Sequence, residues 1–147
     1  MMISFETTDS VMMPRFDQAC VKRWLADVAR AHGFDCGKLA YRFCNDEEIL
    51  DCNVRFLGHD YFTDIITFDY SRGSRVSGDM LISLDTVRSN SELVGCSFDR
   101  ELHRVIVHGL LHLCGINDKG PGEREIMEAH EDEALEMLRK ISNVSEI

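Results

Sequence analysis

The sequence predicts a single α+β domain in which a small mixed β-sheet packs with helices around one buried central helix. The chain has 147 residues, enough for one domain with one hydrophobic core. Segments that alternate like strands are interspersed with segments of helical periodicity, without an internal repeat or a low-complexity linker. Residues 102–113 are apolar on nearly every side, which is typical of a buried helix. We therefore expect residues 1–147 to form one domain.

The first part of the chain contains two predicted strands with a helix between them. The stretch ISFET at residues 3–7 is compatible with a strand. Apolar residues recur at helical spacing from residue 14 to residue 32, and Gly33 follows as a helix stop. The stretch LAYRF at residues 39–43 alternates as a half-buried strand does.

The middle of the chain predicts a short helix followed by a β-hairpin. Asn45 and Glu48 have the spacing of a capping box, so a helix is expected from there through Phe56. The stretches TDIITFDY (63–70) and DMLISL (79–84) are rich in β-branched and aromatic residues. The loop SRGSRVSG between them would join the two into a hairpin.

Helices are predicted for most of the remaining chain. We expect Asp85 to cap a short helix. Ser97 is expected to cap a longer helix that runs through Cys114 and stops at Gly115. A last helix is predicted over residues 121–141.

The composition predicts a cytoplasmic globular protein. Hydrophobic residues make up 44% of the chain and charged residues 29%, which is ordinary for a globular domain. No apolar run approaches the ~20 residues of a membrane span. The first residues lack the layout of a signal peptide. We expect no membrane partner, and we expect the six cysteines to be reduced thiols.

The net charge of −10 has the wrong sign for a protein whose whole surface grips nucleic acid. The excess of acids is concentrated in residues 123–136, which hold seven acids and one base. We interpret this run as a solvated helix face. The rest of the chain is less acidic, so a local basic patch remains possible.

The stretch HGLLHLCGIND at residues 108–118 carries most of the functional information. His108 and His112 are four residues apart, so a helix places them on one face. Two imidazoles in an apolar helix both need polar partners, and a divalent metal would satisfy both, although two hydrogen-bonded core histidines are the simpler alternative. Gly115 would turn the chain so that Asp118 supplies the third ligand. Gly109 either leaves room for a ligand or serves packing.

The same spacing occurs in the HExxHxxGxxH pattern of the metzincin peptidases. Two positions depart from it. Gly109 stands where those peptidases have the glutamate that acts as general base, and Asp118 stands where they have a third histidine. The missing glutamate argues against a peptidase.

The stretch resembles more closely the H-G-x-L-H-L-x-G signature of the YbeY family, bacterial endoribonucleases specific for single-stranded RNA. A second motif agrees with the resemblance, namely an arginine before a T-D-[VI]-[LI]-[ST]-F strand and then G-D on the next strand. The family usually has a histidine at the position of Asp118. The matching residues of the second motif are Arg55, Thr63, Asp64, Phe68, Gly78 and Asp79.

The resemblance implies a zincin-like fold and a metal-dependent endoribonuclease of rRNA maturation, which processes the 3′ end of 16S rRNA and acts in ribosome quality control. It implies one divalent ion per chain, with zinc the expected metal, on His108, His112 and Asp118. It also implies that Arg55 contacts the phosphate, for which a planar guanidinium is well suited. Without the resemblance, a surface salt bridge with Asp51 or Asp60 would be the simpler interpretation.

Other polar residues are weaker candidates. Arg72, Arg75 and Arg88 could line an RNA groove, although arginines in or near loops are commonly just exposed. His59 could approach the metal site, although an exposed loop histidine is the simpler interpretation. His130 could serve as a fourth ligand or replace one of the three predicted ligands. Thr63 and Asp64 are expected to shape the strand entrance rather than to perform chemistry.

Three classes of function follow from these residues. The first is the endoribonuclease, with an rRNA precursor as substrate, small-subunit ribosomal proteins as candidate partners and no DNA. The second is another zinc-dependent hydrolase, such as a peptidase. The third is a ribosome assembly factor with a structural metal.

Overall fold

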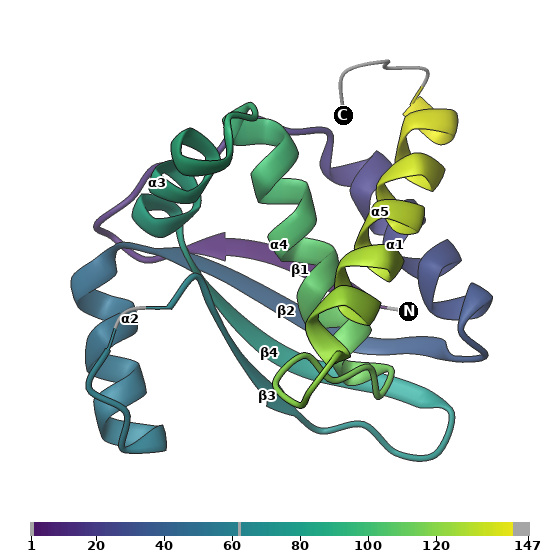
Figure 1. Cartoon of the computed structure of the whole chain (residues 1–147), viewed down its shortest axis with the longest axis horizontal. Coiled ribbons are helices and arrows are strands. Elements are labelled where there is room, and N and C mark those ends of the chain that lie inside the picture. The colour runs from purple at the N-terminus through teal and green to yellow at the C-terminus, as the bar shows by residue number, and fades with distance from the viewer. Residues whose placement is uncertain (1, 62, 143–147) are drawn as a thin grey trace.

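The computed structural model describes residues 2–61 and 63–142 (Figure 1). Within them, a four-stranded sheet has the order β1-β2-β4-β3. β1 pairs parallel with β2, β2 pairs parallel with β4, and β3 pairs antiparallel with β4, so the expected mixed sheet and hairpin are confirmed. The strands are β1 (Met2–Thr7), β2 (Asp35–Cys44), β3 (Ile65–Asp69) and β4 (Arg75–Ser83).

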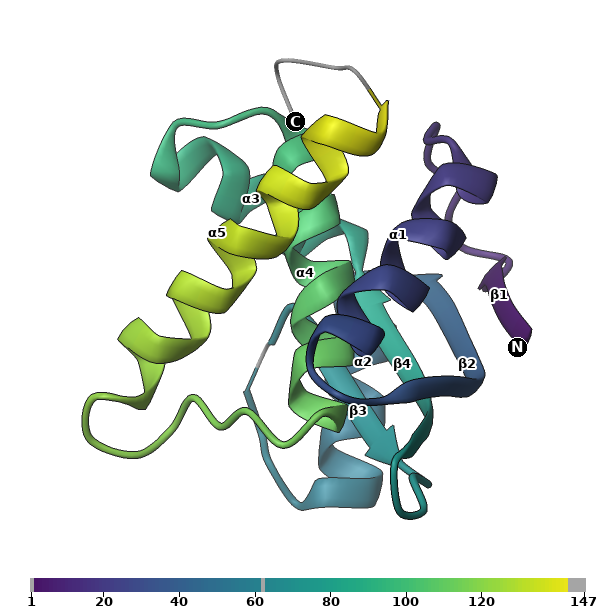
Figure 2. The same ribbon diagram turned by 90° about the vertical axis from the view of Figure 1, so that its right-hand side faces the viewer.

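The helices form two layers around this sheet. Figure 2 shows α4 between α1 and α5 on one face, while α2 lies on the other face (Figure 1). A small separate apolar cluster under α2, built around Ile49 and Ile66, marks that second face. The helical elements are α1 (Gln18–Ala31), α2 (Asp46–Cys52), the π-helical turn η1 (Asn53–Leu57), α3 (Leu84–Val94), α4 (Phe98–Leu113) and α5 (Glu123–Ser142).

The predicted helix boundaries are largely confirmed, with two corrections. The capping box of α2 is present in both directions, and Ser97 caps α4. α1 begins at Gln18, because Asp17 caps it, and not at residue 14. The cap of α3 is Ser83, whose hydroxyl accepts from the backbone N–H of Thr86, so the prediction for Asp85 was wrong.

The central helix α4 is as buried as its apolar sequence predicts. Its residues Leu102, Ile106, Leu110 and Leu111 are completely inaccessible to solvent. The hydroxyl of Tyr41 on β2 donates a 2.8 Å hydrogen bond to the carbonyl of Ile106, which fixes the helix on the sheet. All six cysteines are free thiols. Among the described residues, no helix combines the length and apolarity needed to span a membrane.

The sequence left open whether Gly109 makes room for a ligand or serves packing, and its surroundings in the structure favour packing. A Cβ atom at this position would lie 2.9 Å from Cδ1 of Ile65 and 3.0 Å from Cγ of Met80, on β3 and β4. Both distances are shorter than ordinary carbon contacts, so a larger residue would force the side chains of Ile65 and Met80 to move. The glycine therefore serves the packing of α4.

Candidate metal centre

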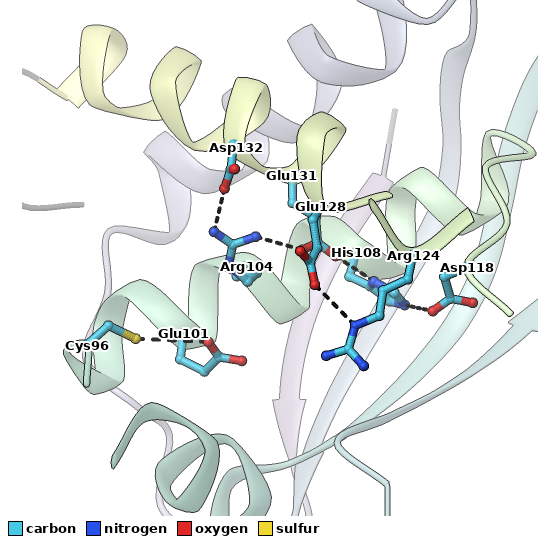
Figure 3. A network of polar contacts seen from close by, with 9 residues as sticks. All are labelled: Cys96, Glu101, Arg104, His108, Asp118, Arg124, Glu128, Glu131 and Asp132. Atoms are coloured by element: carbon cyan, nitrogen blue, oxygen red, sulfur yellow. Dashed lines mark hydrogen bonds and ion pairs between the residues drawn. The ribbon is translucent and has the colours of Figure 1, made fainter. Parts of the chain in front are cut away.

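The end of α4 and the loop after it bring two of the predicted ligands together. Gly115 takes a left-handed conformation at φ 90°, and its N–H donates to the carbonyl of His112. This turn reverses the chain, as is usual for glycine at a helix C-terminus. As a result, Oδ2 of Asp118 lies 3.4 Å from Nε2 of His108 (Figure 3).

The third predicted ligand, His112, shares a pocket with the other two. The pocket has a volume of about 220 Å³ and lies between α4, the start of β3 and the loop after η1. Among the side chains of residues 2–61 and 63–142, no three histidine, cysteine, aspartate or glutamate groups are close enough to hold a metal ion. His108 and Asp118 contact each other in this pocket, whereas His112 lines it with an exposed side chain.

Two imidazole nitrogens and one carboxylate oxygen are a donor set that suits zinc and other divalent ions. His108 is already oriented for such a role. Its Nδ1 lies 2.7 Å from Oε2 of Glu131, which turns Nε2 toward Asp118 and the pocket. The residues present therefore fit a divalent cation.

Glu131 on α5 is a candidate site residue that the sequence interpretation missed. It is buried, and its second oxygen accepts a 2.7 Å hydrogen bond from Arg104, which also pairs with Asp132 (Figure 3). Carboxylates that hold the second nitrogen of a ligating histidine are common around metals. The interpretation of residues 123–136 as a solvated face was thus wrong for this position. A signal was available, because Glu131 belongs to the buried stripe of α5, namely Met127, Glu131, Ala134, Leu135 and Leu138.

The electrostatics of the pocket favour a positive charge. Burial lowers the pKa of His108, but the hydrogen bond with Glu131 and the charges of Asp64 and Asp118 outweigh it, so the pKa is raised overall. Burial raises the pKa of Asp64, which lines the same pocket. Several carboxylates thus surround one histidine, and a bound cation would relieve their mutual repulsion.

Arg55 lies on η1, next to the pocket but not in its lining. Its side chain is 69% exposed, and its Nε lies 3.1 Å from Oδ1 of Asp51, one turn earlier. This is the surface salt bridge that its sequence context offered as the simpler interpretation. The neighbouring residues Asn53 and Leu57 do line the pocket, so a change of side-chain conformation could carry the guanidinium toward it.

The other candidates divide into pocket residues and remote ones. His59 lines the pocket, together with Lys119. Arg72 and Arg75 lie where β3 turns into β4 and are exposed. The guanidinium of Arg88 on α3 stacks 4.5 Å above the ring of Phe98.

His130 packs elsewhere, with its ring centroid 5.0 Å from that of His32, the C-cap of α1. Neither His130 nor the three candidate RNA-binding arginines lines the pocket of His108.

Comparisons with known proteins agree with this picture. The family model described as Endoribonuclease YbeY matches residues 2–139. A protein of that name from Phocaeicola vulgatus is 58% identical over 137 residues, which cover 93% of this chain and 99% of the relative. One from Bacteroides thetaiotaomicron is 58% identical over 130 residues, covering 88% and 95%.

A solved structure also matches almost the whole chain. The solution structure of a protein from Thermotoga maritima superposes with a TM-score of 0.65 at 24% identity, covering 99% of this chain and 96% of the other. At that identity the match supports the fold alone. The extent of the family match and the identity to the relatives establish the rest: the chain belongs to the Endoribonuclease YbeY family.

Proposed function

We propose that this protein is a metal-dependent endoribonuclease that cuts single-stranded regions of ribosomal RNA precursors, with His108, His112 and Asp118 as the metal ligands. The observation that carries the proposal is the pocket that these three side chains line, with Nδ1 of His108 held by a buried carboxylate. Family membership supports RNA as the substrate.

Each residue of the site has a distinct task in the proposed reaction. A divalent ion, which we expect to be zinc, would lower the pKa of a water molecule or polarise the phosphoryl group. Glu131 keeps a proton on Nδ1 of His108, so that Nε2 stays available as a ligand. Arg55 would exchange Asp51 for the phosphate, to which its guanidinium can donate two parallel hydrogen bonds.

The substrate we infer is the 16S rRNA precursor, cut near its 3′ end in the cytoplasm as part of ribosome maturation and quality control. Small-subunit ribosomal proteins are the partners we would test first. With a net charge of −10, the protein must hold RNA through a few local cations. Lys119 in the pocket and Arg55 beside it are two candidates.

The peptidase alternative is disfavoured by the packing of α4. A peptidase of this pattern needs a glutamate beside the first histidine as its general base. That position is Gly109, where even a Cβ would crowd β3 and β4. The remaining alternative, an assembly factor with a structural metal, differs from the proposal only in lacking turnover.

A cleavage assay separates these functions. The protein should cut a labelled single-stranded RNA, lose this activity with a chelator and regain it with added zinc. His112→Ala should abolish cutting, whereas His130→Ala, which alters a histidine outside the pocket, should not. Metal binding without cleavage would favour the assembly factor, and casein turnover without RNA cleavage would favour a peptidase.

A further inference from the structure

A stacked pair of aromatic rings stands at the pocket, with no role in the chemistry described so far. The rings of His59 and Tyr61 are 5.2 Å apart between centroids and tilted by only 17°. The hydroxyl of Tyr61 also lies 3.1 Å from Nδ1 of His59. Both residues are exposed, Tyr61 to 52%, so the pair is accessible from solvent.

The position of this pair is determined by the structure around it. Both residues line the pocket that contains His112. The buried side chain of Asn53 donates a 2.8 Å hydrogen bond from its amide to the carbonyl of Tyr61, which fixes the backbone on η1. Leu57, also in the pocket lining, is 45% exposed and extends the apolar surface.

We propose that the His59–Tyr61 pair is a stacking platform for one unpaired base of the RNA strand whose phosphate lies in the pocket. This inference rests on the proposed function and adds how the substrate is selected. An aromatic face accepts any base by stacking, which is the common way in which proteins bind single-stranded nucleic acid. A base inside a duplex already has neighbours on both faces and cannot use the platform. Selectivity for single strands follows from this geometry.

We assign the platform to an RNA base because His59 and Tyr61 line the same pocket as the proposed metal ligands. A strand whose phosphate reaches His108, His112 and Lys119 must place an adjacent base against the walls of the same pocket. An exposed apolar surface at the edge of a polar pocket is also typical of interaction sites in general. A second copy of the chain is therefore the competing occupant that the test must separate.

Substitutions at Tyr61 provide the first test, with kcat and KM measured on a short single-stranded RNA. Tyr61→Ala should raise KM about tenfold, with metal content and thermal stability unchanged. Tyr61→Phe should recover most of the lost affinity, because it keeps the ring and removes only the hydroxyl. The matched control is Tyr70→Ala, since Tyr70 is 59% exposed but lies outside the pocket. Equal KM values for Tyr61→Ala and the wild type would overturn the proposal.

An abasic scan of the RNA provides the second test. Removing the base at one position should weaken binding to the wild type and have no further effect on Tyr61→Ala, because both changes remove the same contact. Equal losses for both proteins at every position would refute the platform. So would a loss of self-association in Tyr61→Ala with unchanged RNA affinity, which would assign the surface to a second copy. A wild type that cuts no RNA would instead refute the proposed function.

Discussion

The two sides of the candidate centre differ in how firmly the protein holds them. On the α5 side, Glu131 and Arg104 connect His108 to the body of the fold through hydrogen bonds of 2.7 Å. On the η1 side, Arg55 is exposed and pairs only with its helical neighbour Asp51. One side is thus held by buried hydrogen bonds, and the other carries an exposed ion pair that would have to open if Arg55 binds the phosphate as proposed. We therefore expect metal affinity to depend on Glu131 and RNA turnover to depend on Arg55.

The largest effect on metal affinity is expected at Asp118, the proposed third ligand. Asp118→Ala should lower zinc affinity by more than the roughly 100-fold that loss of an outer partner costs. Asp118→His should keep the metal and shift preference toward zinc, because imidazole is softer than carboxylate. Metal titration measures both. Unchanged zinc affinity in Asp118→Ala would mean that the third ligand is another residue, and His59 would be examined next because it lines the pocket.

The firmly held side is tested by Glu131→Gln. The amide preserves the shape but not the charge, so zinc affinity should fall by about 10- to 100-fold. Glu128→Gln is the matched control, since Glu128 is exposed on the same helix and pairs with Arg124. If both variants bind zinc like the wild type, the buried carboxylate serves stability only.

The loosely held side is tested by Arg55→Ala. This variant should keep its fold and metal while kcat/KM for RNA falls at least about tenfold, or about 1.4 kcal/mol of transition-state stabilisation. Arg23→Ala removes a similarly exposed arginine that pairs with Asp27 one turn away, and it should not affect cutting. Wild-type turnover in folded, metal-loaded Arg55→Ala would leave this residue as a surface ion pair.

The smallest effect concerns salt. Since Lys119 is the single lysine or arginine among the described lining residues of this pocket, log affinity for RNA should fall only gently with log salt, at about 0.7 per phosphate contacted on a single strand. Fluorescence anisotropy over a range of potassium chloride concentrations measures the slope. A slope equivalent to about eight or more contacts would contradict a local groove.

Most of the fold could be predicted because local signals determine it. The apolar stretch 102–113 and the stop at Gly115 predicted the buried helix and the turn that brings Asp118 to His108, and the structure confirms both. The family and the α+β fold class are also confirmed. The ligand roles of His108, His112 and Asp118 remain predictions.

What could not be predicted depends on tertiary contacts. Glu131 meets His108 across 23 residues of sequence, inside a run that is acidic almost throughout. The cap of α3 was misassigned because β4 passes into the helix without a loop, so Ser83 ends one element and caps the next. The sequence does not determine the side-chain conformation of Arg55, because Asp51 and Asp60 are both acidic residues with which it could pair.

The packing of Gly109 has a consequence for how such proteins can diverge. The position where a peptidase of this pattern carries its base is here a contact between α4 and the β3–β4 hairpin. A glutamate at this position would require the side chains of Ile65 and Met80 to move or to be replaced by smaller ones. Exchange between the two chemistries therefore involves the residues of the hairpin as well as position 109, because the packing of helix against hairpin must change with it.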